Sequence, residues 1–91
     1  MSTPTSDPTT ACFSVTAQVA PGVMPRVLEL FAKRGLVPDR FDCRRDGSAL
    51  TLDIAMHGMD LELARYIGRC MNQIFEVDCV LVSEKRYADV A

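Results

Sequence analysis

Regular alternation of apolar and polar residues distinguishes the first structured segment of the chain. In the segment CFSVTAQ, residues 12–18, every second residue is apolar. A period of two is typical of a strand that buries one face and exposes the other. The pattern therefore predicts a strand that begins near Ala11 and ends before the turn formed by Pro21-Gly22.

Two longer segments carry apolar residues at helical spacing. Over residues 23–31 the apolar positions recur every three or four residues, which is the period of an amphipathic helix. Pro25 fits in the first turn of this helix, because a backbone N–H there would have no partner within the helix. The sequence Lys33-Arg34-Gly35 provides cations and a glycine at the C-terminal end of the helix. The segment Met59–Phe75 repeats the pattern, with Asp60 as the expected N-cap. The sequence thus predicts two helices.

A hairpin is predicted between the two helices. The segments Phe41–Arg45 and Ser48–His57 flank Asp46-Gly47, and glycine tolerates the positive φ that a type I′ turn requires. A two-residue loop at that place would put Cys43 opposite Leu50 on the apolar face. The other face of the hairpin would be polar, as expected for a sheet covered on one side.

The order of these elements predicts the fold class. A last apolar run, Val77–Ser83, has the length of a strand. Strand, helix, strand, strand, helix and strand, joined by right-handed crossovers, form a ferredoxin-like α+β sandwich with four antiparallel strands and two helices on one face. The first and third strands would be central. We expect residues 1–10 to be a flexible lead-in, residues 11–83 the domain, and residues 84–91 a polar tail.

Composition and charge narrow the function classes. A net charge of −2 and a pI near 5.2 provide no basic surface to attract phosphates, so nucleic acid is not an expected partner. No apolar run approaches the about 20 residues of a membrane span. The first eleven residues lack the basic start and apolar centre of a signal peptide, so we expect a cytoplasmic protein without membrane contact. A domain of 91 residues has a small core, which favours oligomerisation.

Residues suited to catalysis or metal binding are sparse. The single histidine, His57, is expected on the open face of the sheet, with a pH-responsive contact to a partner as the alternative. The cysteines lie far apart without ligand spacing, and we interpret three of them as core or near-core residues. Those three are Cys43, Cys70 and Cys79, and the fourth cysteine is Cys12. The sequence therefore predicts no catalytic residue, no metal site and no cofactor.

Two segments resemble the ACT domains, the regulatory amino-acid-sensing version of this fold. PGVMPRVLELFAKRGL is similar to the first loop and helix, and IGRCMNQIFEVDCVLV to the second helix and last strand, of acetolactate synthase regulatory small subunits. The resemblance spans Phe13–Val82. It implies a non-catalytic homodimer joined along the second strand, with Val37, Asp39 and Phe41 at the interface. The implied partner is a thiamine-dependent catalytic subunit on another chain.

The same resemblance implies a site for an effector, with a branched-chain amino acid as the expected ligand. Family members bind effectors between the first loop and the neighbour's second strand, and Gly22 would let the ligand approach the backbone. The matching residues are Pro21, Gly22, Val23 and Met24. Val19 and Val37-Pro38 stand where many members carry polar residues. Two alternatives are a stand-alone amino-acid sensor for another client and a small acylphosphatase-type hydrolase.

Overall fold

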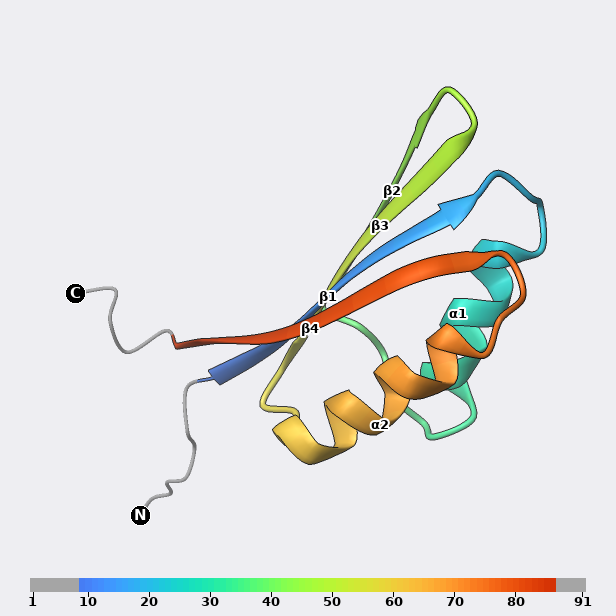
Figure 1. The fold of residues 1–91 in the computed structure, drawn as a ribbon. Coiled ribbons are helices and arrows are strands. Elements are labelled where there is room, and N and C mark those ends of the chain that lie inside the picture. The colour runs from blue at the N-terminus through green and yellow to red at the C-terminus, as the bar shows by residue number, and fades with distance from the viewer. Residues whose placement is uncertain (1–8, 87–91) are drawn as a thin grey trace, which may run out of the picture.

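A computed structural model describes residues 9–86 as one four-stranded antiparallel sheet packed against two helices (Figure 1). The strand order is β2-β3-β1-β4, so β1 and β3 are central and β2 and β4 are the edges. This confirms the predicted ferredoxin-like sandwich. In chain order the elements are β1 (Thr9–Gln18), α1 (Val23–Ala32), β2 (Arg40–Asp46), β3 (Ala49–His57), α2 (Leu61–Asn72) and β4 (Val77–Arg86). Neither described helix is long and apolar enough to cross a membrane.

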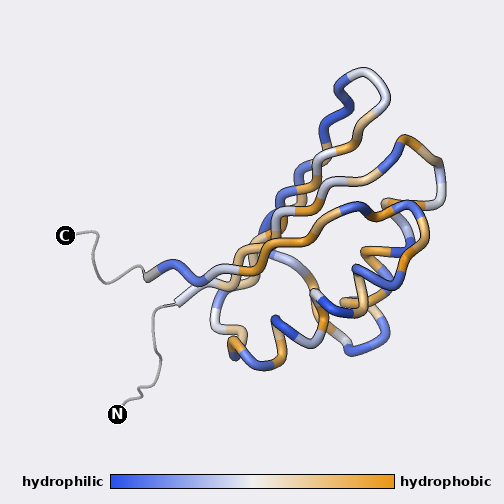
Figure 2. Tube along the Cα trace, viewed as in Figure 1, coloured by the Kyte–Doolittle hydropathy of each residue, from blue (hydrophilic) through white to orange (hydrophobic). Residues whose placement is uncertain are grey.

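Two strands extend beyond the apolar segments that predicted them. β1 begins at Thr9 and β4 runs to Arg86, and these two residues pair with each other. The last part of β4 is hydrophilic (Figure 2), because pairing between backbones requires no apolar side chains. Of the expected lead-in over residues 1–10, the first eight residues lie outside the described part of the chain. The expected tail lies outside it from residue 87 onward.

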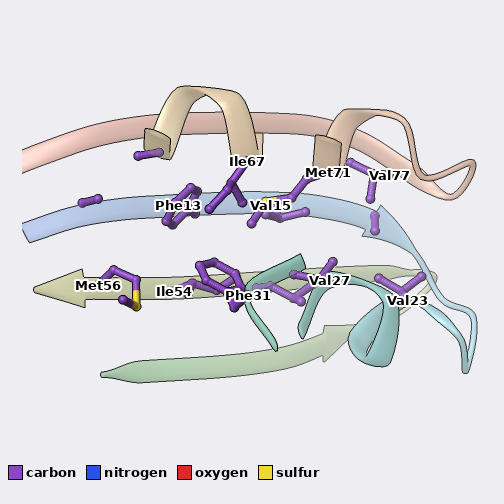
Figure 3. Packing of buried hydrophobic residues seen from close by; sticks show 14 of the residues in the cluster. Phe13, Val15, Val23, Val27, Phe31, Ile54, Met56, Ile67, Met71 and Val77 are labelled. Carbon is purple, nitrogen blue, oxygen red and sulfur yellow. The ribbon is translucent and has the colours of Figure 1, made fainter. Parts of the chain in front are cut away.

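The core lies between the sheet and the two helices. Phe13 and Val15 of β1 are buried and lie near Val27 and Phe31 of α1 (Figure 3). The rings of Phe13 and Phe31 meet edge to face, with centroids 5.5 Å apart and planes 88° apart. This is a favoured geometry for an aromatic pair. The alternation in β1 and the helical stripe in α1 therefore form the two sides of one core.

The β2–β3 hairpin forms with a different turn from the predicted one. Asp46 pairs with Ala49, so the loop is Gly47-Ser48 and the predicted Asp46-Gly47 loop is wrong. Gly47 has φ +63°, and no described residue other than glycine has a positive φ. A type I′ turn needs positive φ at both loop residues, whereas type II′ needs it at the first alone. The observed loop therefore meets the requirement of a type II′ turn.

The changed turn shifts the pairing of the strands by two residues. Cys43 faces Leu52, and Arg40 faces Ala55. Because side chains alternate with a period of two, this shift keeps every residue on the face predicted for it. Arg40 hydrogen-bonds through Nε to the Asp42 carboxylate on its own strand, which raises the pKa of the Arg40 guanidinium.

A bulge at the start of β4 reverses the faces of that strand. Thr16 pairs with Cys79 and Ala17 pairs with Val77, so Asp78 has no opposite residue. Cys79 therefore lies on the open face with an exposed side chain. The prediction that Cys79 belongs to the core is wrong, because an apolar run does not reveal where an extra residue enters. Val77, before the bulge, is buried.

Helix α2 approaches the sheet closely at Gly68. A Cβ atom built on Gly68 would lie 2.7 Å from Cγ2 of Val82 in β4, which is closer than carbon atoms pack. Asp60 occupies the predicted N-cap position, where its carbonyl accepts the N–H of Ala64 at 2.9 Å. Its side chain makes no capping hydrogen bond. Gly68 thus determines how near α2 lies to β4.

Candidate functional site

The predicted effector loop connects β1 to α1 at one end of the sheet. Pro21 is exposed and Gly22 is half-buried. Val23 is fully buried in the core, whereas 37% of Met24 is exposed. The structure therefore divides the four predicted residues. Three of them reach the surface, and the Val23 side chain supports the loop from below.

The first turn of α1 has one unused backbone donor. The N–H of Val23 donates to the carbonyl of Ala20 at 3.3 Å, and the N–H of Arg26 donates to the N-cap carbonyl at 3.2 Å. Pro25 has no N–H. The described residues supply no backbone acceptor for the N–H of Met24. An anionic group placed at this helix N-terminus would meet that donor and the positive end of the helix dipole.

A cation, Arg26, also lies at the loop, and it is not one of the four residues predicted there. Nη1 of Arg26 lies 3.3 Å from Oε1 of Glu76, in the connection between α2 and β4. A Cβ on Gly22 would lie 3.6 Å from Cζ of Arg26, so the guanidinium covers this glycine. The Arg26 side chain is 58% exposed, and an exposed ion pair of this kind exchanges partners at little cost. Its position four residues after Gly22, one helical turn, is the signal that could have identified it.

The residues predicted at the dimer interface lie at the start of β2. Phe41 is in the strand and half-buried, whereas Val37 and Asp39 precede the strand. Val37 is 81% exposed. The Asp39 carboxylate accepts the backbone N–H of His57 at 2.6 Å, and its own N–H donates to Ala55. Asp39 therefore fixes the α1–β2 connection to β3 through these two hydrogen bonds.

An apolar strip accompanies this edge of the sheet. Met24 and Leu28 lie one turn apart on α1 and are 37% and 38% exposed. They project from the side of α1 opposite Arg26, whose partner Glu76 adjoins α2. Since α2 packs on β4 and β2 is at the far end of the sheet, the strip lies on the β2 side. Within the sheet formed by residues 9–86, the β2 edge thus combines an unpaired strand with apolar surface.

The open face of the sheet has a shallow hollow of ≈ 680 Å³, and His57 lies at one end of it. Nδ1 of His57 is 2.8 Å from Oγ1 of Thr10, which confirms that the histidine is on the open face. Acids and bases both line the hollow, among them Asp53 and Lys85. Within residues 9–86 no three side chains are grouped to hold a metal ion.

All four cysteines are free thiols. Cys12, Cys43 and Cys70 are half-buried, and Cys43 packs against the core. The position of Cys43 agrees with its near-core interpretation, whereas Cys70 is half-buried outside the set of residues that pack against the core. The Cys79 thiol differs from the other three because it is exposed. It shares the open face with Cys12, but it lies on the edge strand.

Comparison with known proteins identifies one family. A family model described as an ACT-like domain matches residues 5–88. The crystal structure of the ACT domain from GTP pyrophosphokinase of Chlorobium tepidum is similar, with a TM-score of 0.70 and 8% identity over 81% of this chain and 96% of that chain. The solution structure of the C-terminal domain of the MgtC protein from Mycobacterium tuberculosis gives 0.68 and 11%, over 98% of this chain and 100% of that chain. At such identities the structures show a shared fold alone. No curated protein matches.

Proposed function

The chain belongs to the family of ACT-like domains, a regulatory and amino-acid-binding domain type, and we propose that it is a regulatory subunit. In this proposal it dimerises through β2 and binds an amino acid at the β1–α1 loop. One observation carries the proposal. Three features lie next to one another: the β2 edge, the apolar strip of α1, and the β1–α1 loop with the Met24 N–H and the Arg26 guanidinium. Met24 belongs to both the strip and the loop.

The charges of β2 support pairing with a second copy. The strand reads RFDCRRD, and its charges are opposite about the central Cys43. In an antiparallel pair centred on Cys43, Asp42 would face Arg44 of the partner subunit, and Arg40 would face the partner's Asp46. Cross-strand pairs of opposite charge stabilise a sheet, and like charges destabilise it. This edge is therefore complementary to itself.

A charge-exchange experiment tests this pairing. We expect Asp42→Arg alone and Arg44→Asp alone to weaken the dimer, because each puts like charges opposite one another. The double variant restores opposite pairs and should restore the dimer, as measured by sedimentation equilibrium. Mild oxidation should also link two Cys43 thiols across the two-fold axis, and Cys43→Ser should remove the link. A double variant as monomeric as the single variants would contradict this register.

The effector site follows from the loop. An amino acid carries a carboxylate, which the Met24 N–H and the Arg26 guanidinium could receive together. Arg26 thereby provides the polar contact that Val19 does not. Because the apolar strip adjoins the loop, a branched aliphatic side chain is the ligand we propose.

A thermal-shift scan against the twenty amino acids tests the site, since a ligand that binds the native state alone raises the melting temperature. We expect valine, leucine or isoleucine to do so, and Arg26→Gln to abolish the rise. Lys33→Gln, the same loss of charge at the other end of α1, is the matched control and should keep it. Gly22→Val should weaken binding and leave the dimer intact. Equal affinity in wild type and Arg26→Gln would remove the loop from consideration.

We propose acetolactate synthase as the client, because the first loop, both helices and the last strand resemble its regulatory small subunits. The partner would be its thiamine-dependent catalytic subunit. Mixing the purified proteins should raise catalytic activity or make it sensitive to the effector. An amino acid that binds this chain without any effect on that enzyme would favour a different client.

A further inference from the structure

The second edge of the sheet differs in chemistry from the first. β4 has β1 as its single neighbour in the described sheet, so its outer side is unpaired there. A groove of ≈ 270 Å³ lies between this strand and α2. We call it the β4 groove. It is lined by Arg65, Gly68, Arg69, Asn72, Val80 and Val82.

The β4 groove has an apolar floor and a basic wall. Val80 and Val82 are half-buried and form the floor, which α2 can approach because Gly68 has no side chain. Arg65 and Arg69 are exposed and stand one helical turn apart along the wall. Among the described residues, no acidic one lines the groove.

Other side chains define the extent of this basic surface. Cζ of Arg69 lies 5.8 Å from the centroid of the Tyr66 ring, a cation–π contact that steadies the guanidinium. Two acidic residues lie beyond the Arg65 end of the groove. They are Glu62, earlier on α2, and Glu84, later on β4. The basic stretch is therefore short, with room for a few side chains of a partner.

A second copy of the chain does not suit this edge. Antiparallel pairing of two β4 strands would bring the two α2 helices together on the same side of the joined sheet. Arg65 and Arg69 would then approach the same arginines of the other copy, and like charges across an interface cost several kcal/mol. The β2 edge, with its opposite charges about Cys43, has no such conflict.

We propose that the β4 groove binds an extended acidic segment of a partner protein, which pairs with β4 as a fifth strand. Strand addition to an exposed edge is an established mode of peptide recognition, in which the main chain supplies affinity and alternate side chains supply specificity. Here the alternate side chains on the helix side would be carboxylates, and each would face one arginine of α2.

The spacing of the arginines fits this arrangement. Four residues of α-helix rise about 6 Å, which is the separation of Arg65 and Arg69 along the axis. Two residues of a strand rise about 6.6 Å, so side chains at alternate positions recur at nearly the same interval. A segment with acidic residues two apart can therefore place one beside each guanidinium.

The intervening side chains of the segment would lie on the open face. There Leu81 of β4 is 65% exposed and would contact an apolar residue of the partner. The proposed recognition sequence thus alternates acidic and apolar residues, as in Glu-Val-Glu. This pattern distinguishes the segment from a nucleic acid, which has phosphates but no strand backbone to pair with β4.

The test uses the full chain and a fluorescein-labelled peptide, Gly-Thr-Glu-Val-Glu-Val-Glu-Thr-Gly, followed by fluorescence anisotropy. We expect saturable binding that Arg65→Glu with Arg69→Glu weakens by about tenfold or more. Lys33→Glu with Arg45→Glu makes the same charge change at the end of α1 and on β2, the opposite edge of the sheet, and should bind as wild type. A peptide with lysine in place of glutamate should bind the α2 variant better than it binds wild type.

Two further measurements separate strand addition from simple charge attraction. Methylation of alternate backbone nitrogens in the peptide should abolish binding, because it removes main-chain donors, and wild-type affinity for the methylated peptide would overturn the proposal. Hydrogen exchange should show protection of β4 amides when the unmodified peptide binds. Absence of binding, or binding unchanged in the α2 variant, would also overturn it.

A polyanion is the competing occupant. Single-stranded RNA and unlabelled peptide are compared as competitors of the labelled peptide. If RNA competes at the lower concentration, and its binding depends on the same arginines, the surface binds RNA and the proposal fails. The α2 variants do not alter Arg26 or β2, so failure here is distinguishable from failure of the effector site or the dimer. Circular dichroism of each variant establishes that it is folded.

Discussion

The contact between Gly68 and Val82 gives a quantitative test of the packing. Gly68→Ala introduces one methyl group in the middle of α2. In an exposed helix this substitution stabilises by about 0.5–1 kcal/mol, because alanine loses less backbone entropy on folding. Here the new Cβ would lie 2.7 Å from Cγ2 of Val82. Two opposite effects therefore act at one position.

The packing term should exceed the helix term. Valine has a branched side chain whose χ1 rotation is restricted, so Cγ2 of Val82 cannot rotate away freely. Overpacking a core usually costs about 1–3 kcal/mol. Subtracting the helix gain leaves a net destabilisation of up to about 2 kcal/mol. For a domain of this size, each 1 kcal/mol lowers the melting temperature by about 4–8 °C.

Val82→Ala provides the matched background, because it removes the atom that the new methyl group would strike. In that background Gly68→Ala should stabilise the protein by about 0.5–1 kcal/mol, so the sign of its effect reverses. Urea denaturation followed by circular dichroism at 222 nm measures all four proteins. One fixed protein concentration is needed, since a dimer gains apparent stability with concentration.

The double-mutant cycle measures how strongly Gly68 and Val82 are coupled. We expect a coupling free energy of about 1–3 kcal/mol between the two positions. If Gly68→Ala stabilises wild type and the coupling is near zero, α2 moves away from β4 without cost. In that case Gly68 would not determine the helix position.

Three further predictions concern the turn, the open face and the connection before β2. Gly47→Ala should lower the free energy of unfolding by about 1–2 kcal/mol, because Gly47 has φ +63°; an unchanged urea midpoint would show that the turn relaxes. Cys79 should react with Ellman's reagent before the half-buried thiols, and Cys79→Ser should remove the fast phase; a fast phase that persists would place another thiol at the surface. Asp39→Ala removes the acceptor of the His57 N–H and should cost about 1 kcal/mol in urea denaturation, whereas Asp78→Ala at an exposed site should cost less.

Local pattern in the sequence was sufficient for the elements and their order. The alternation in β1 predicted correctly which side chains enter the core. The helical spacing around Val27 identified the buried Val23, Val27 and Phe31, but Met24 and Leu28 of the same pattern are exposed. Glycines and prolines predicted where elements end. These properties depend on residues close together in the chain, where a side-chain period follows directly from backbone geometry. With right-handed crossovers, the order of elements then left the ferredoxin-like sheet as the expected topology.

The exact pairing of strands was decided by the tertiary structure. The loop moved from Asp46-Gly47 to Gly47-Ser48, since both registers keep apolar residues on the same face and the alternation alone cannot choose between them. The bulge at Asp78 carried Cys79 to the open face, and nothing in an apolar run reveals an extra residue.

The sequence also did not predict which residues form the loop surface and the β4 groove. The Arg26 guanidinium that covers the β1–α1 loop also meets Glu76, fifty residues later in the chain, and the sequence did not predict this contact. The β4 groove exists because Gly68 meets Val82 across two elements. The sequence by itself determined which elements form and, for the strands before the β4 bulge, which face each one buries. Which residues from distant segments share a site depends on how α1, α2 and the two sheet edges pack, because short-range periodicity contains no distance between separate elements.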